Sequence, residues 1–176
     1  VFDNAYNSLW VQAFAHPDWD MFQSAHPAGA FHAAARAISG GPVYVSDNPE
    51  RHDFQILAKL TVSGGRVLRC EDPALPAPGT FFDDGRAERI VTKIVNLNRV
   101  PGLEAPIRVL GLFNCFYGEA GAEPVSGEYG VADLGAEAAA PRHALYHHTT
   151  GQATVTTGPA ERFPIRLEGL GFELVT

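Results

Sequence analysis

The pattern of apolar residues changes in kind at Gly64–Gly65, and this change restricts the possible folds more than any other feature of the chain. Upstream, helical spacing alternates with short continuous apolar runs, as in a parallel α/β sheet or a (β/α)-barrel. Downstream, short strand-like runs recur between turn residues, which is typical of a β-sandwich. We therefore expect an α/β region over 1–70, a stiff connector over 71–88 and an antiparallel β-sandwich domain over 89–176.

Local signals place helices and strands within these regions. Phe31, Ala35 and Ile38 share one helical face, and Gly40–Gly41 follows as a stop signal. The α/β region is expected to hold helices over 2–16, 27–39 and 53–60, with strands at 18–22 and 42–45. Further strands are expected at 90–95, 109–113, 144–146, 153–155, 163–167 and 171–175, and a surface loop at 132–140.

The acidic composition narrows the class of partner. With 13 basic and 20 acidic side chains the formal net charge is −7, which disfavours nucleic acid and anionic membrane surfaces. No apolar run approaches the ~20 residues that a membrane helix requires. Only two cysteines are present, Cys70 and Cys115, so we expect a reducing compartment and a cytoplasmic location.

The only methionine, Met21, bears on the extent of the chain. The sequence begins at Val1 rather than at a methionine, and it shows no signal-peptide pattern. A helix that begins at residue 2 without a capping side chain points the same way. We expect the chain to be processed, or to be a piece of a longer protein.

Carboxylates at the ends of the two expected parallel strands are the first candidates for a site. Asp18 and Asp20 are two residues apart, so on a strand they point to one side, and Asp47 directly follows the second strand. In barrels the carboxyl ends of strands form the active-site face. These acids could hold a polyhydroxylated ligand while Trp19 offers an apolar face to a sugar ring. The plainer alternative is that Asp18 caps a turn and Asp47 caps the next helix.

Histidines and cysteines provide weaker signals. His143 and His147 have a four-residue spacing, but that spacing suits a metal only on a helix, and this segment has strand character, so no metal site is expected. His26 could reach the same site as Asp20. The cysteines have no metal spacing and no adjacent base, so buried inert thiols are expected. No phosphate loop or dinucleotide fingerprint is present, and no cofactor is expected.

Several segments also match one known family in order along the chain. They are Asn7–Trp10, Pro17–Ser24 with His26–Pro27, His32–Ala37, Gly40–Asp47, Val67–Arg69, Lys93–Asn98, Gly111–Cys115 and Leu170–Thr176. With these motifs the chain resembles the raffinose synthase and seed imbibition protein branch of glycoside hydrolase family 36. That branch includes alkaline α-galactosidases and galactosyltransferases.

The resemblance implies an architecture, and it implies where the catalytic and the substrate-binding residues lie. The chain would be the last part of a (β/α)8 TIM barrel followed by a C-terminal antiparallel β-sandwich domain. The catalytic residues, an aspartate nucleophile and an aspartate acid/base, would lie upstream of Val1, so none is expected in this chain. Substrate binding would fall to the galactose-subsite block Asp18, Trp19, Asp20 and Met21, and to Asp47 on the neighbouring strand end.

Two functions from different classes follow. The first is a retaining α-galactosidase or α-galactosyltransferase acting on raffinose-family oligosaccharides, of which this chain would be an inactive piece. The second is a non-catalytic carbohydrate-binding or structural β module. Hydrolase and transferase cannot be separated at this level, because the choice depends on how an acceptor site admits or excludes water.

Overall fold

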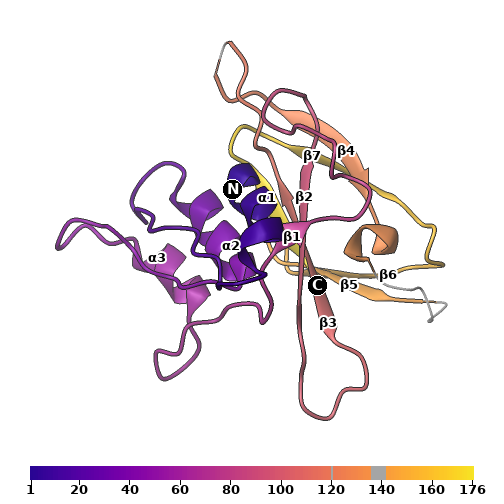
Figure 1. Cartoon of the computed structure of the whole chain (residues 1–176), viewed down its shortest axis with the longest axis horizontal. Helices are drawn as coiled ribbons and strands as arrows, with labels where there is room; N and C mark the ends of the chain where they lie inside the picture. The colour runs from indigo at the N-terminus through magenta and orange to yellow at the C-terminus, as the bar shows by residue number, and fades with distance from the viewer. Residues whose placement is uncertain (120, 136–141) are drawn as a thin grey trace.

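A computed structural model describes residues 1–119, 121–135 and 142–176. It shows helices against one face of a six-stranded sheet and a smaller two-stranded sheet against the opposite face (Figure 1). The coarse prediction of a mixed helical part followed by an antiparallel β part is therefore confirmed. Within the described residues no helix has the length and apolar character needed to cross a bilayer.

The helical layer is formed by the first third of the chain. Its elements are α1 (Phe2–Val11), α2 (Gly29–Ser39), α3 (Phe54–Leu57) and the 3-10 helix η1 (Ala58–Leu60). Helix α2 ends at Gly40, whose φ of +75° is a conformation that glycine adopts without strain. Asp53 caps α3 by accepting hydrogen bonds from the N–H groups of Gln55 and Ile56.

One parallel contact links the segments on either side of α2. Phe22 and Val45 form an isolated parallel bridge, in which the Phe22 N–H donates to the Tyr44 carbonyl at 3.4 Å and the Ser46 N–H donates to the Phe22 carbonyl at 2.9 Å. The order is therefore extended segment, helix and parallel extended segment, which is the pattern of a βαβ unit. The continuous strands expected at 18–22 and 42–45 are reduced to this bridge.

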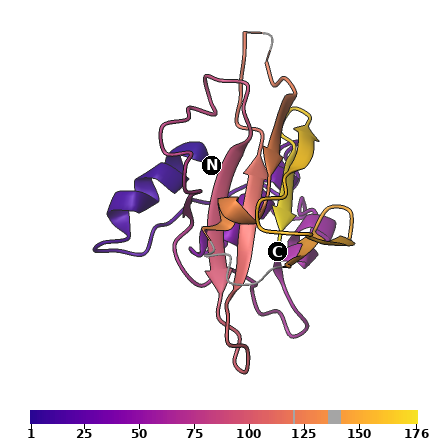
Figure 2. The ribbon, with the colours of Figure 1, turned by 90° about the vertical axis from the view of Figure 1, so that its right-hand side faces the viewer.

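The β part contains two sheets with antiparallel pairing. The larger has the order β1-β2-β3-β8-β5-β6, and the smaller pairs β4 with β7. Figure 2 shows the two long strands β2 and β3 side by side. The strands are β1 (Leu75–Pro76), β2 (Thr92–Asn98), β3 (Ile107–Phe113), β4 (Val125–Tyr129), β5 (Ala144–His147), β6 (Gln152–Val155), β7 (Phe163–Leu167) and β8 (Phe172–Val175).

Strand β3 is buried on both faces, and its alternation separates two cores. Val109 and Phe113 point toward the helical layer, where they join a cluster with Ile38 of α2. Leu110 and Leu112 point the other way, into a cluster formed with β4 and β7. This two-residue alternation is the ordinary consequence of strand geometry, and it places a single sheet between two apolar layers.

The structure corrects the sequence prediction in three places. The connector contains β1, whose Leu75 and Pro76 pair with β2 at the edge of the sheet, where proline is tolerated. Strand β4 was not expected, because Gly127 at its centre interrupts the apolar pattern. A Cβ there would meet Val91 at 3.1 Å. Part of the expected loop 132–140 forms the 3-10 helix η2 (Val131–Leu134), and 136–141 lie outside the described residues.

Candidate functional site

The loop that precedes Phe22 presents two carboxylates on its exposed side. Asp18 and Asp20 are exposed, whereas Trp19 between them is buried, so the predicted alternation is present. The Oδ1 atom of Asp18 accepts the Asp20 N–H at 2.8 Å and Oδ2 accepts the Tyr44 hydroxyl at 2.8 Å. The first of these bonds is the turn cap that was the plainer alternative for Asp18. The Asp18 hydrogen bond is also the main cause that raises the pKa of Tyr44.

Asp20 has an uncommon backbone conformation. Its φ of +68° lies in the left-handed region, which few residues other than glycine adopt without cost. Its Oδ1 accepts the N–H of Met21 at 2.7 Å. The carboxylate is thereby held at the exposed tip of the loop, beside Met21, whose side chain is also exposed.

Trp19 does not have the role that the sequence suggested. Its ring is 1% exposed and lies in the cluster between α2 and the sheet, with Nε1 donating to the Ser8 hydroxyl at 3.3 Å. No ring face is left for a sugar, so this part of the prediction is wrong. The apolar area of the indole is larger than that of any neighbour in the loop, and burying it anchors the loop to the core.

Arg36 of α2 holds the same loop from inside. Its Nη2 donates to the carbonyls of Trp19 at 2.7 Å and Met21 at 3.2 Å, and Nε donates to the carbonyl of Asp20 at 3.1 Å. Nη1 lies 2.9 Å from Nδ1 of His32. Burial lowers the pKa of Arg36, and the charges of Asp20 and Asp18 oppose that shift. One guanidinium therefore sets the path of three consecutive residues.

Asp47 is a buried connector rather than an open ligand. Its side chain is 1% exposed, and it accepts hydrogen bonds from the Ser24 N–H and hydroxyl, both at 2.6 Å, and from Nδ1 of His52 at 3.1 Å. The Ser24 hydroxyl in turn accepts the Asp53 N–H at 2.8 Å. The hydrogen bond from the Ser24 hydroxyl is the largest cause that lowers the pKa of Asp47. The carboxylate has no open side for a substrate, and the cap of α3 is Asp53, so both interpretations of Asp47 are wrong.

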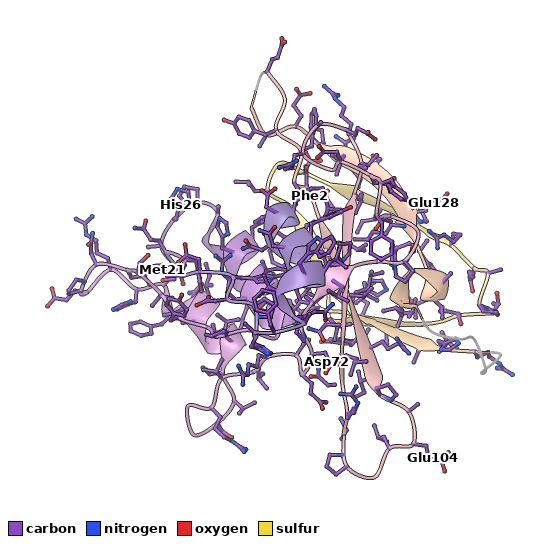
Figure 3. The ribbon with its side chains drawn as sticks, viewed as in Figure 1. Phe2, Met21, His26, Asp72, Glu104 and Glu128 are labelled. Carbon is purple, nitrogen blue, oxygen red and sulfur yellow. The ribbon has the colours of Figure 1, made fainter. Side chains whose placement is uncertain are left out.

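A polar pocket of about 210 Å³ opens beside this loop, at the carboxyl end of the parallel bridge. It is lined by Met21, Phe22, Gln23, His26, His32 and Ser46. In Figure 3 the labelled Met21 and His26 lie on the side of the helical layer away from the six-stranded sheet. Carboxyl ends of parallel strands are where ligand sites form in α/β proteins, so this is the candidate site.

His32 is the most perturbed side chain of the pocket. Its pKa is lowered to about 4, first by burial and then by the charge of Arg36. A guanidinium can only donate, so Nδ1 of His32 must be the acceptor and the proton of the neutral ring is on Nε2. The sequence offered one signal for this pair that was not used: an arginine within the alanine-rich face of a helix, four residues after a histidine.

The remaining chemical candidates do not form a site. Both cysteines are free, and burial raises the pKa of Cys70 to about 11 and that of Cys115 above its usual value. Among the described residues no three histidine, cysteine or acidic side chains come together as a metal site. His147 lies on β5 against Tyr129, in the strand conformation expected for it.

The comparisons with known proteins agree on one family. The model of the family described as raffinose synthase or seed imbibition protein Sip1 matches residues 1–124. The chain belongs to this family, and its resemblance to the branch within glycoside hydrolase family 36 is confirmed.

Curated relatives carry names of the same kind. A galactinol–sucrose galactosyltransferase of Oryza sativa subsp. japonica is 54% identical over 112 residues, and one of Pisum sativum is 53% identical over the same length. Stachyose synthase of Pisum sativum is 44% identical over 112 residues. Each match covers 63% of this chain, but only 12–14% of the relative. The matched part is thus between about one eighth and one seventh of the relatives' length.

A solved structure shares the fold. The protein, from Bacillus halodurans C-125 and provisionally described as an alpha-N-acetylgalactosaminidase, aligns with a TM-score of 0.51 at 12% identity. The alignment covers 84% of this chain and 30% of the other. A protein with a distantly related sequence therefore has a similar arrangement of the helical layer and the sheets.

Proposed function

We propose that these residues belong to a longer enzyme that transfers an α-galactosyl group between raffinose-family sugars. The observation that supports it most strongly is the match of residues 1–124 to the raffinose synthase family, together with relatives named as galactosyltransferases. The match covers the whole candidate site. The relatives' names favour transfer over hydrolysis, while an α-galactosidase activity remains the second outcome of the test.

Within that enzyme, residues 1–70 would form the end of a (β/α)8 barrel, and 89–176 the C-terminal β-sandwich domain. The parallel bridge between Phe22 and Val45, with α2 between them in the chain, supports the barrel. The β part supports the sandwich because β4 and β7 lie against the larger sheet. The nucleophile and the acid/base would lie outside these 176 residues.

The site residues would have two kinds of role. Asp18, Asp20 and Met21 would form the exposed rim that contacts sugar hydroxyls. Trp19 and Asp47 would act through the loops that they anchor, because both side chains are buried. Precise placement of a sugar matters because an oxocarbenium-like transition state is sensitive to small displacements of the ring.

Replacement of the rim carboxylate tests this proposal. In the full-length enzyme, Asp20→Gly should lower galactosyl transfer from galactinol to sucrose at least about tenfold, since a charge-assisted hydrogen bond is lost. Glycine tolerates a φ of +68°, so the free energy of unfolding should change by less than about 1 kcal/mol. Glu104→Gln, on the exposed loop between β2 and β3, is the matched control (Figure 3).

Product analysis decides between the alternatives. Raffinose formed from galactinol and sucrose supports a transferase, and free galactose alone indicates a hydrolase. Unchanged kinetics in Asp20→Gly would remove Asp20 from the site. A full-length protein that binds galactosides without turning them over would instead favour the carbohydrate-binding module.

A further inference from the structure

The pocket beside the Asp20 loop has a lining without formal charge. Its six lining residues include two histidines, one amide and one hydroxyl, but no carboxylate, lysine or arginine. His26 accepts the Ala28 N–H on Nδ1 at 3.1 Å, which leaves its Nε2 as the remaining polar atom of the ring. Such a lining suits the hydroxyl groups of an uncharged sugar better than a phosphate or a carboxylate.

His32 differs from the other lining residues because its ring is fixed on two sides. Its ring makes a T-shaped contact with the Phe31 ring at a centroid distance of 5.6 Å and an interplanar angle of 87°. Its Nδ1 accepts from Arg36 at 2.9 Å. Nε2, across the ring, is then the only polar atom of His32 left for a ligand, and it carries a proton.

Arg36 cannot easily turn away from this arrangement. Its side chain is buried, and its other two nitrogens donate to the three carbonyls of the Asp20 loop. A fork with several fixed hydrogen bonds has little freedom to rotate. The same residue that shapes the exposed rim therefore decides which nitrogen of His32 is protonated.

We infer that His32 is a specificity-determining residue that donates its Nε2–H to one sugar hydroxyl oxygen in this pocket, with Arg36 as the positioning residue that enforces the donor tautomer. This inference rests on the galactoside function proposed above. It assigns to His32 a binding role and not that of a general acid or base. It also predicts that the hydroxyl in contact with His32 is recognised as an acceptor.

Two replacements of His32 separate the donor from the acceptor. The Oδ1 of asparagine can take the place of Nδ1, so His32→Asn keeps an acceptor for Arg36 and removes the donor from the pocket. The Nε2 amide of glutamine can take the place of the ring Nε2, so His32→Gln keeps the donor and loses the acceptor. Both variants are made in the full-length enzyme, and thermal unfolding checks that they fold.

The expected results are opposite for the two variants. His32→Asn should unfold close to the wild-type temperature but bind methyl α-galactoside about fivefold more weakly as an inhibitor of transfer, the loss expected for one neutral hydrogen bond. His32→Gln should keep most of the affinity while its unfolding temperature falls. A merely structural histidine would lose both together.

Galactosides that each lack one hydroxyl locate the contact. One member of the series should inhibit the wild type about fivefold more weakly than the parent and inhibit His32→Asn no more weakly than the parent does. Equal affinity of His32→Asn and wild type for every member would overturn the inference while leaving the galactoside function standing. A wild-type enzyme that neither binds nor transfers galactosides would overturn both.

Discussion

Arg36 is a buried cation that donates to neutral acceptors, three backbone carbonyls and one imidazole nitrogen. A single buried carbonyl that loses its donor costs about 1–3 kcal/mol, and the removal of a desolvated charge returns part of that cost. This buried side chain therefore determines the backbone path of the exposed rim residues Asp20 and Met21. The position of Asp20 thus depends on Arg36, a residue that the spacing of the carboxylates in the sequence does not identify.

Replacement of Arg36 should be costly for that reason. Arg36→Met is expected to lower the free energy of unfolding by about 3 kcal/mol, because the carbonyls of Asp20 and Met21 lose their side-chain donor and that of Trp19 keeps only the longer bond from Asn4. Urea denaturation measures the change. Arg51→Met removes an exposed arginine and is the control. Equal stability of the two variants would show that water or another donor replaces the guanidinium.

The low pKa of His32 makes stability depend on pH in a defined interval. The unfolded side chain takes up a proton near pH 6.5, whereas the folded one resists it down to about pH 4. Within this interval the unfolded state binds more protons, so the free energy of unfolding should fall as the solution is acidified. His32→Asn should flatten this slope.

The pH interval in which His32 affects stability is separate from the interval in which Asp47 does. The folded pKa of Asp47 is lowered from 3.8, so its contribution is present above that value and is lost as the pH falls further. Measurements from pH 7 to about 4.5 therefore report on His32 and not on Asp47. An unaltered slope in His32→Asn would contradict the buried neutral imidazole.

At the scale of elements, the end of α2 controls how the helical layer meets the sheet. Gly40 has a φ of +75°, and a Cβ built on it would lie 2.0 Å from the Asp72 carbonyl oxygen. The Asn96 side chain of β2 donates to the carbonyls of Ile38 and Asp72 at the same junction. The end of α2, the connector at Asp72 and strand β2 therefore meet around Gly40, where the Asn96 side chain joins them by hydrogen bonds.

Gly40→Ala should consequently lower the free energy of unfolding by more than the positive φ of Gly40 alone predicts. The left-handed φ costs about 1 kcal/mol for alanine, and the clash with backbone should bring the total to about 3 kcal/mol or more. Gly64→Ala is the matched control, since Gly64 has a φ of +87° and no atom within 4 Å of the added Cβ. Chemical denaturation of both variants should show a difference of about 2 kcal/mol.

At the scale of the molecule, the two regions of the sequence share one core. Trp19 and Ile38 from the helical layer pack with Ile94 and Phe113 from the sheet. Neither face could be uncovered without exposing apolar area to water. The helical layer and the larger sheet are therefore expected to unfold together rather than one after the other.

Phe113→Ala tests this cooperativity. The ring is fully buried, so its loss should lower the free energy of unfolding by about 3–5 kcal/mol. Tryptophan fluorescence reports on the helical layer and far-ultraviolet circular dichroism on the strands as well. Both signals should shift to lower denaturant by the same amount. Separate transitions would mean that the helical layer is stabilised independently of β3.

Much of the local structure follows from short-range chemistry and was predicted from the sequence. The alanine-rich face and glycine stop of α2, and the strand character of β2, β3 and β8, arise from residues close together in the chain. Strand β4 was missed because its apolar pattern is interrupted by Gly127. The block Pro17–Ser24 carried the family, since its residue order is specific where periodicity is not.

The candidate site was predicted only in part. Asp18 and Asp20 alternate outward as expected, but Trp19 and Asp47 are buried, and Arg36 and His32 were not recognised. By itself the sequence determined most of the elements, the alternation of the loop and the family, because these depend on neighbours in the chain. Tertiary structure decided which side chains face the pocket and which loop carbonyls Arg36 holds, because burial and the reach of Arg36 are set by contacts across 15 or more residues.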